Sequence, residues 1–72
     1  MSRLFEHSIA YYPPLDGPAV RLSMADSHGG EHWRIVSARP GASLRAARTR
    51  AREAIEEHIA RGLPPGEVGV VG

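Results

Sequence analysis

The chain has 72 residues, of which 42% are hydrophobic and 24% charged, with a formal net charge of +1. This length allows one domain with a small core, over residues 1–72, and the absence of cysteine excludes disulfides and thiolate-bound metals as extra stability. No apolar run approaches the roughly 20 residues of a membrane-spanning helix, and the N-terminus lacks the apolar segment of a signal peptide. These features predict a cytoplasmic protein without membrane contact, and the thin core favours a homodimer.

The first half of the chain predicts three β-strands, over residues 4–12, 19–25 and 31–38, because apolar and polar residues alternate there. Prolines at 13–18 and a glycine-containing turn at 26–30 separate the strands, which predicts an antiparallel meander. The residues that share one face of their strand are Phe5, Ile9 and Tyr11, then Val20, Leu22 and Met24, then Trp33 and Ile35. We expect the second group to point inward and Trp33 to lie in the core.

The second half predicts one helix over residues 44–61. Ser43 suits the N-cap position, and Gly62 with the following prolines ends the helix. Valines in residues 67–71 predict a last short strand or a loose tail. One stripe of small and apolar residues faces the sheet: Leu44, Ala47, Ala51, Ile55, His58 and Ile59. The fold class is therefore α+β, with a three- or four-stranded antiparallel sheet in the order β-β-β-α-β and one helix packed on one face.

The histidines are the first candidates for chemistry. His28 and His32 flank a tight turn but lack the third and fourth ligands of a zinc site, so we expect both to be solvated. His7 and His58 fall on apolar faces, where we expect partial burial and a backbone partner. No serine lies in a nucleophile elbow, and Asp26 belongs to a turn, where aspartate bonds its own backbone. The sequence predicts no metal, no cofactor and no catalytic residues, hence not an enzyme.

The charges of the predicted helix suggest a binding surface. Arg45, Arg48 and Arg52 recur at spacings of three and four and form one stripe, whereas the acidic residues follow in the second half. This order is opposite to the one that the helix dipole favours, so an anionic partner would stabilise it. The partner is either nucleic-acid phosphate or an acidic protein surface, and the alternative is that the arginines are simply solvated.

The open face of the predicted sheet offers a second candidate surface. Arg21, Arg34 and Tyr12 are expected to share that face, where they would contact a partner or phosphate. A sheet that binds RNA presents aromatic side chains outward, and only Tyr12 has the right position in its strand.

Gly41, the Ser43 cap, Leu44 and the alanines that lead to the Ala54-Ile55 pair resemble the same pattern in the HicB-like antitoxin family. The segments that carry the resemblance are residues 41–47 and 51–55 of the helix, 62–65 at its exit, and 9–13 with 16–17 in the first hairpin. The resemblance covers about residues 4–70, although the family's proline-rich stretch between the second and third strands is replaced here by the turn at 26–30. It implies a small bacterial or phage protein that assembles into dimers and neutralises an RNA-cleaving toxin.

Three functional hypotheses follow. The first is a non-enzymatic protein-binding module of HicB-like type that masks a partner protein. The second is direct nucleic-acid binding through the arginines of the helix. The third is a structural subunit whose arginine-rich helix holds a homo-oligomer together.

Overall fold

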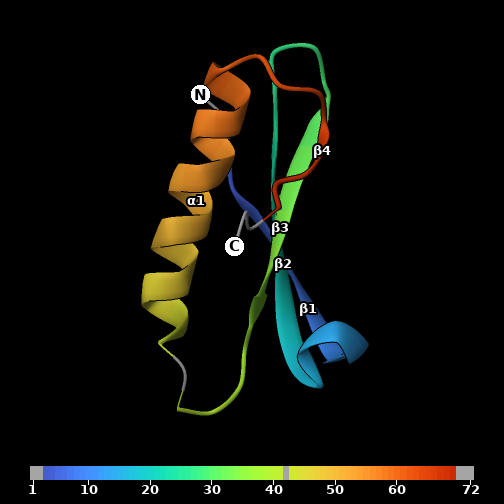
Figure 1. Ribbon diagram of the computed structural model, residues 1–72, viewed down its shortest axis with the longest axis vertical. Coiled ribbons are helices and arrows are strands. Elements are labelled where there is room, and N and C mark those ends of the chain that lie inside the picture. The colour runs from blue at the N-terminus through green and yellow to red at the C-terminus, as the bar shows by residue number, and fades with distance from the viewer. Residues whose placement is uncertain (1–2, 42, 70–72) are drawn as a thin grey trace.

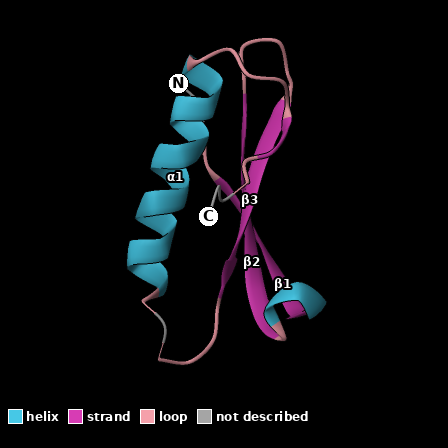
Figure 2. Ribbon diagram, in the orientation of Figure 1, coloured by secondary structure: helices cyan, strands magenta, loops and turns pink. Residues whose placement is uncertain are grey.

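The computed structural model describes residues 3–41 and 43–69 and confirms the α+β fold. Three long strands, β1 (Phe5–Tyr12), β2 (Gly17–Ala25) and β3 (Glu31–Ser37), precede the helix α1 (Leu44–Ala60) and the short strand β4 (Gly66–Glu67), as Figures 1 and 2 show. A 3-10 turn, η1 (Pro13–Leu15), joins β1 to β2. The strand order is β1-β2-β3-β4, with antiparallel pairs except that β4 runs parallel to β3, so the sheet is mixed.

The helix begins and ends close to its predicted bounds. Ser43 takes the N-cap position, but its hydroxyl makes no capping hydrogen bond. At the other end Gly62 has a φ of 68°, and its N–H donates to the Ile59 carbonyl, while Leu63 N–H donates to the His58 carbonyl. This pair of bonds is a Schellman motif, which satisfies the last carbonyls of the helix. No helix in the described part of the chain is long and apolar enough to cross a membrane.

The predicted last strand is shorter than expected. The structure places β4 at Gly66–Glu67, and Val68 N–H continues the ladder with a 2.7 Å bond to the Trp33 carbonyl. The predicted residues 70 and 71 lie outside the described residues.

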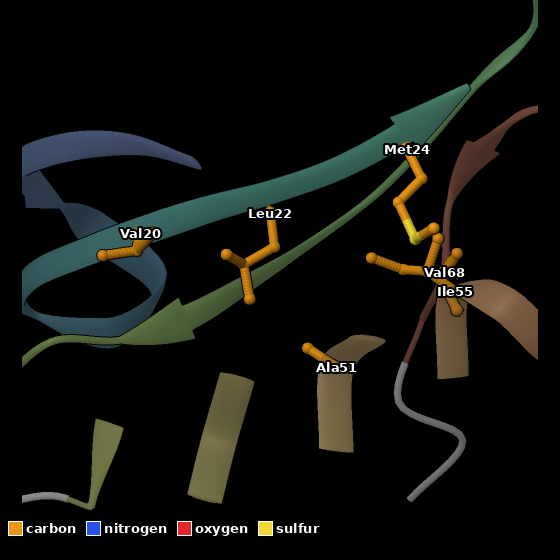
Figure 3. Packing of buried hydrophobic residues seen from close by; sticks show 6 residues of the cluster. All are labelled: Val20, Leu22, Met24, Ala51, Ile55 and Val68. Carbon is orange, nitrogen blue, oxygen red and sulfur yellow. The ribbon is translucent and has the colours of Figure 1, made fainter. Parts of the chain in front are cut away.

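The core lies between α1 and one face of the sheet. Its buried side chains come from the middle strand, the helix and the segment after β4: Val20, Leu22, Met24, Ala51, Ile55 and Val68 (Figure 3). Leu22 and Ile55 are completely buried, and the small Ala51 on the helix is 1% exposed. The inward direction predicted for the apolar residues of β2 is therefore confirmed.

The strand register places the other apolar residues on the face away from the helix. Phe5 pairs with Ser23, and Ser23 pairs with Trp33, so these three side chains share the face opposite to Leu22. The prediction that Trp33 lies in the core is therefore wrong. Side chains alternate between the two faces along β1 and β2 as expected. However, the apolar residues Phe5 and Ile9 of β1 lie on the opposite face from the apolar residues Val20, Leu22 and Met24 of β2.

Candidate functional site

The face of the sheet that α1 does not cover carries a group of apolar side chains. We call it the sheet-face patch and define it as Phe5, Ile9, Trp33 and Ile35, with Arg21 at its centre. Phe5 is 52% exposed, and the other four residues are half-buried. Figure 1 shows the helix on the opposite side of the sheet, and no described helix covers the patch.

Strand β2 contributes small residues to this face. Ala19 and Ser23 are almost completely buried, at 1% and 3% exposure, although no helix of residues 3–41 and 43–69 lies over them. The larger side chains of β1 and β3 on the same face must therefore cover them, since those are their cross-strand neighbours. The result is a continuous surface of side chains rather than a cleft, which suits a protein partner better than a small molecule.

Arg21 is held in place over the patch. Its guanidinium lies 4.8 Å from the centre of the Trp33 ring, a cation–π distance, and it also donates to the Glu31 carboxylate. The ion pair balances the charge of Arg21, and the exposed His7, which pairs with Arg21 in the register, shares this part of the face. The prediction that Arg21 belongs to the open sheet face is confirmed.

The other residues predicted for this face are not brought together with Arg21. Arg34 pairs with Leu22 and therefore lies on the helix side of the sheet. Tyr12 lies opposite Gly17 at the far end of the hairpin, beyond a shift in register after Ile9. The expectation that Arg21, Arg34 and Tyr12 form one surface is wrong, because the register separates Arg34 from Arg21.

Of the three arginines in the helix stripe, one makes an ion pair with the sheet. Arg45, Arg48 and Arg52 are all exposed, but Arg48 donates from Nε to Oε1 of Glu6 on β1 at 2.9 Å. Within residues 3–41 and 43–69, Arg45 and Arg52 have no ion-pair partner. The central arginine is thus neutralised by the sheet, which weakens the stripe as an anion-binding site.

Three linked polar side chains, one buried and two half-buried, lie at the C-terminal end of the helix. His32 on β3 is completely buried, and its Nε2 lies 2.8 Å from Oδ2 of Asp26. Its Nδ1 lies 2.8 Å from Nδ1 of His58 in the last full turn of α1. The other carboxylate oxygen of Asp26 accepts the backbone N–H groups of His28 and Gly30, at 2.9 and 2.8 Å. The hydrogen bonds between Asp26, His32 and His58 therefore link the β2–β3 turn to the helix.

The proton positions in this chain follow from the carboxylate. The hydrogen bonds from His32 and from the backbone of Gly30 lower the pKa of Asp26 to about 2, so Asp26 is a charged acceptor at neutral pH. His32 must then carry its proton on Nε2, and when His32 is neutral its Nδ1 accepts the proton of His58 Nδ1. The Nε2 atom of His58 is left without a partner in the described part of the chain and is not fully buried.

Of the four predictions about histidine burial, two are confirmed and two are wrong. His28 is exposed as expected, but His32 is buried rather than solvated, and His7 is exposed rather than buried. His58 is half-buried as expected, yet its partner is the His32 side chain and not the backbone. The register explains the burial of His32, which pairs with Met24, because residues paired with the inward face of β2 also face the core.

The chain of imidazoles does not form a metal site. Asp26 and His58 bond to opposite nitrogens of the His32 ring, so their ligand atoms do not converge on one point. In the described part of the molecule, no three His, Asp or Glu side chains are grouped as metal ligands. Likewise, no described Ser or Thr hydroxyl is hydrogen-bonded to either imidazole, as a nucleophile would be.

Comparisons of the chain with models of protein families, with curated proteins and with solved structures found no match. The sheet-face patch has the larger apolar surface, and the helix stripe has two unpaired arginines.

Proposed function

We propose that this chain is a non-enzymatic protein-binding module, and that the sheet-face patch is its binding surface. The observation that carries the proposal is that the sheet has two apolar faces but one described helix, which covers only one of them. Large exposed apolar surfaces rimmed by polar residues are typical of protein interaction sites. The continuous surface of the patch and the anchored Arg21–Trp33 pair also fit this role, because arginine and tryptophan are enriched among the residues that dominate binding energy.

The finer form of the proposal follows from the resemblance to HicB-like antitoxins. In that form the domain acts sterically, covering the active or binding face of a partner protein, with an RNA-cleaving toxin as the partner that the resemblance implies. The arginines of the helix, Arg45 and Arg52, would then contact acidic groups at the margin of the partner. Masking requires no chemistry from the domain itself.

Affinity capture with the tagged full chain tests the proposal. Three proteins are compared in lysate of the source organism: the unmodified chain, Phe5→Asp in the patch, and Leu63→Asp as a matched control. Phe5 and Leu63 are both exposed apolar residues, but Leu63 lies after the helix and away from the patch. We expect one specific protein to be retained by the unmodified chain and by Leu63→Asp, and to be lost with Phe5→Asp.

Two results would overturn the proposal. The first is the absence of any specific protein partner, and the second is a partner that Phe5→Asp binds as well as the unmodified chain. Duplex DNA and RNA are added in a parallel titration. Binding that falls steeply with salt and disappears when Arg45, Arg48 and Arg52 are replaced together by Glu would instead favour nucleic acid as the ligand.

A further inference from the structure

We infer that the outer edge of β1 takes an extended segment of the partner protein as an added strand, and that this segment alternates acidic and apolar residues. We call this surface the β1 edge and define it as residues 5–9. The inference deepens the proposed function and rests on it, because it takes the ligand to be a protein and gives that protein a strand beside the sheet-face patch.

The backbone along the β1 edge lacks a neighbouring strand among the described residues. The sheet order is β1-β2-β3-β4, so within residues 3–41 and 43–69 β1 pairs with β2 alone. In an antiparallel pair, alternate residues direct their N–H and C=O groups away from the paired strand. About half of the backbone groups of residues 5–9 therefore point outward, where they can pair with another chain. An extended segment is the ligand that satisfies them.

The β1 edge has few of the features that protect sheet edges from such pairing. The strand contains no proline and no lysine, and its register with β2 is regular from Phe5 to Ile9, before the shift toward Tyr12. At the opposite edge of the sheet, β4 has only two residues. In the part of the chain that the structure describes, β1 is therefore the edge that is long and regular enough to take a partner strand.

On the helix side, the β1 edge borders a recess that carries more positive than negative charge. The recess has a volume of about 310 Å³ and is lined by Leu4, Glu6, Arg48, Thr49 and Arg52. Glu6 is already bonded to Arg48, whereas Arg52 is exposed and has no ion-pair partner within residues 3–41 and 43–69. An acidic side chain of the added strand would pair with Arg52 here without breaking the bond between Glu6 and Arg48.

On the other side, the β1 edge is continuous with the sheet-face patch. Phe5 and Ile9 belong to the patch, and the exposed His7 lies between them on the same side of the strand. An added strand lies about 4.8 Å from β1, so its side chains on this side would extend the patch. Apolar residues suit the positions beside Phe5 and Ile9, and a basic residue is disfavoured beside His7 and the nearby Arg21. Because successive side chains of a strand point to opposite faces, the two sides together specify alternating acidic and apolar residues.

Synthetic peptides test the inference on the full chain. The probe is a fluorescein-labelled peptide of four Val-Glu repeats. Its matched controls are four Val-Lys repeats, which reverse the charge, and a peptide of the same Val-Glu composition with all the valines first, which removes the alternation. In fluorescence anisotropy the Val-Glu peptide should bind, and both controls should bind at least about tenfold more weakly.

Two substitutions and two modified peptides locate the contact. Arg52→Glu should weaken binding about three- to tenfold, whereas Arg50→Glu, the same charge change at an exposed arginine outside the stripe, should weaken it less than about twofold. Methylating the amide nitrogens of alternate peptide residues tests the backbone bonds, because only one of the two alternate sets faces β1. One methylated peptide should lose binding and the other should keep it. In hydrogen exchange, amides of residues 5–9 should gain protection when the peptide binds.

The outcomes separate this inference from the proposed function. Failure of the Val-Glu peptide to bind, or equal binding of the two methylated peptides, overturns the inference. If Phe5→Asp nevertheless loses the captured partner, the proposed function stands. If the peptide binds as expected but Phe5→Asp keeps the captured partner, the edge and not the patch is the binding surface. Protection of residues 5–9 that rises with chain concentration in the absence of peptide would show that a second copy occupies the edge, and the inference would fail.

Discussion

Replacing His32 by leucine should destabilise the domain by about 2–3 kcal/mol. His32 is completely buried and makes two side-chain hydrogen bonds, to Asp26 and to His58. Leucine keeps much of the volume but makes neither bond, and each buried hydrogen bond contributes about 1–1.5 kcal/mol net. A chain of 72 residues is expected to have a total unfolding free energy of about 4–11 kcal/mol. The variant should therefore fold, with a much reduced margin.

Urea unfolding followed by Trp33 fluorescence measures this loss, because Trp33 is the only tryptophan. With a denaturant slope of about 1 kcal/mol per molar, the midpoint should fall by 2 to 3 M with little change in slope. His58→Leu alone removes only the outer bond and should remove about 1 kcal/mol. In the His32→Leu background it should add almost nothing, because that bond is already gone. If His32→Leu lowered the unfolding free energy by less than 1 kcal/mol, or if the effects of the two changes were additive, the linked hydrogen bonds of Asp26, His32 and His58 would not be a stabilising unit.

Four further predictions concern the core, the turn and the surface. Ile55→Ala should lower the unfolding free energy by about 3–4 kcal/mol in urea titrations, because the side chain is fully buried against the sheet. Asp26 has a pKa lowered from its usual 3.8 to about 2, so its stabilisation is present above about pH 4 and is lost as the pH falls toward 2. Asp26→Asn should abolish that acid-dependent part of the unfolding free energy. Gly30→Ala should lower the melting temperature, because the added Cβ would lie 2.4 Å from Cγ of Pro65 and overpacking typically destabilises by about 1–3 kcal/mol. Glu6→Ala removes the exposed ion pair with Arg48 and should change the unfolding free energy by less than about 1 kcal/mol. A larger loss would show that this ion pair is not screened by solvent.

The fold could be predicted from the sequence because its signals are local. The alternation of residues marked the strands, the spacing of Ala51 and Ile55 marked the buried side of the helix, and Gly62 marked its end. Each of these patterns depends on residues that are close in the chain. The parallel pairing of β4 with β3 was not predicted, since it depends on contacts between residues about 34 positions apart.

The faces of the sheet could not be assigned from the sequence because the assignment depends on register. Phe5 and Leu22 each lie on the apolar side of their own strand, and either alignment of the two strands preserves both patterns. Because Phe5 pairs with Ser23, Phe5 and Leu22 lie on opposite faces of the sheet. A shift by one residue would have placed them together and buried Phe5 under the helix. The exposed patch is therefore a consequence of one register choice.

The polar chain at Asp26 was missed for a related reason. Its members are separated by 6 and 26 residues, and no spacing rule connects a turn, a strand and a helix end. In the sequence His32 lies beside the predicted turn, at the start of the predicted third strand, and its pairing with Met24 turns it toward the core. A buried imidazole needs hydrogen-bond partners at both nitrogens, so locating His32 in the core would have prompted a search for two partners.

The two candidate surfaces differ in what they contribute to the stability of the domain itself. Arg48 is bonded to Glu6, so an anion that recruited the stripe would first have to break a contact between the helix and β1. The sheet-face patch lies on the face of the sheet away from α1, so covering it removes apolar area from water without breaking the ion pair between the helix and β1. Binding at the patch should therefore raise the unfolding free energy of the domain, whereas binding at the stripe loses part of its gain to the broken ion pair. This asymmetry favours the sheet face as the functional surface.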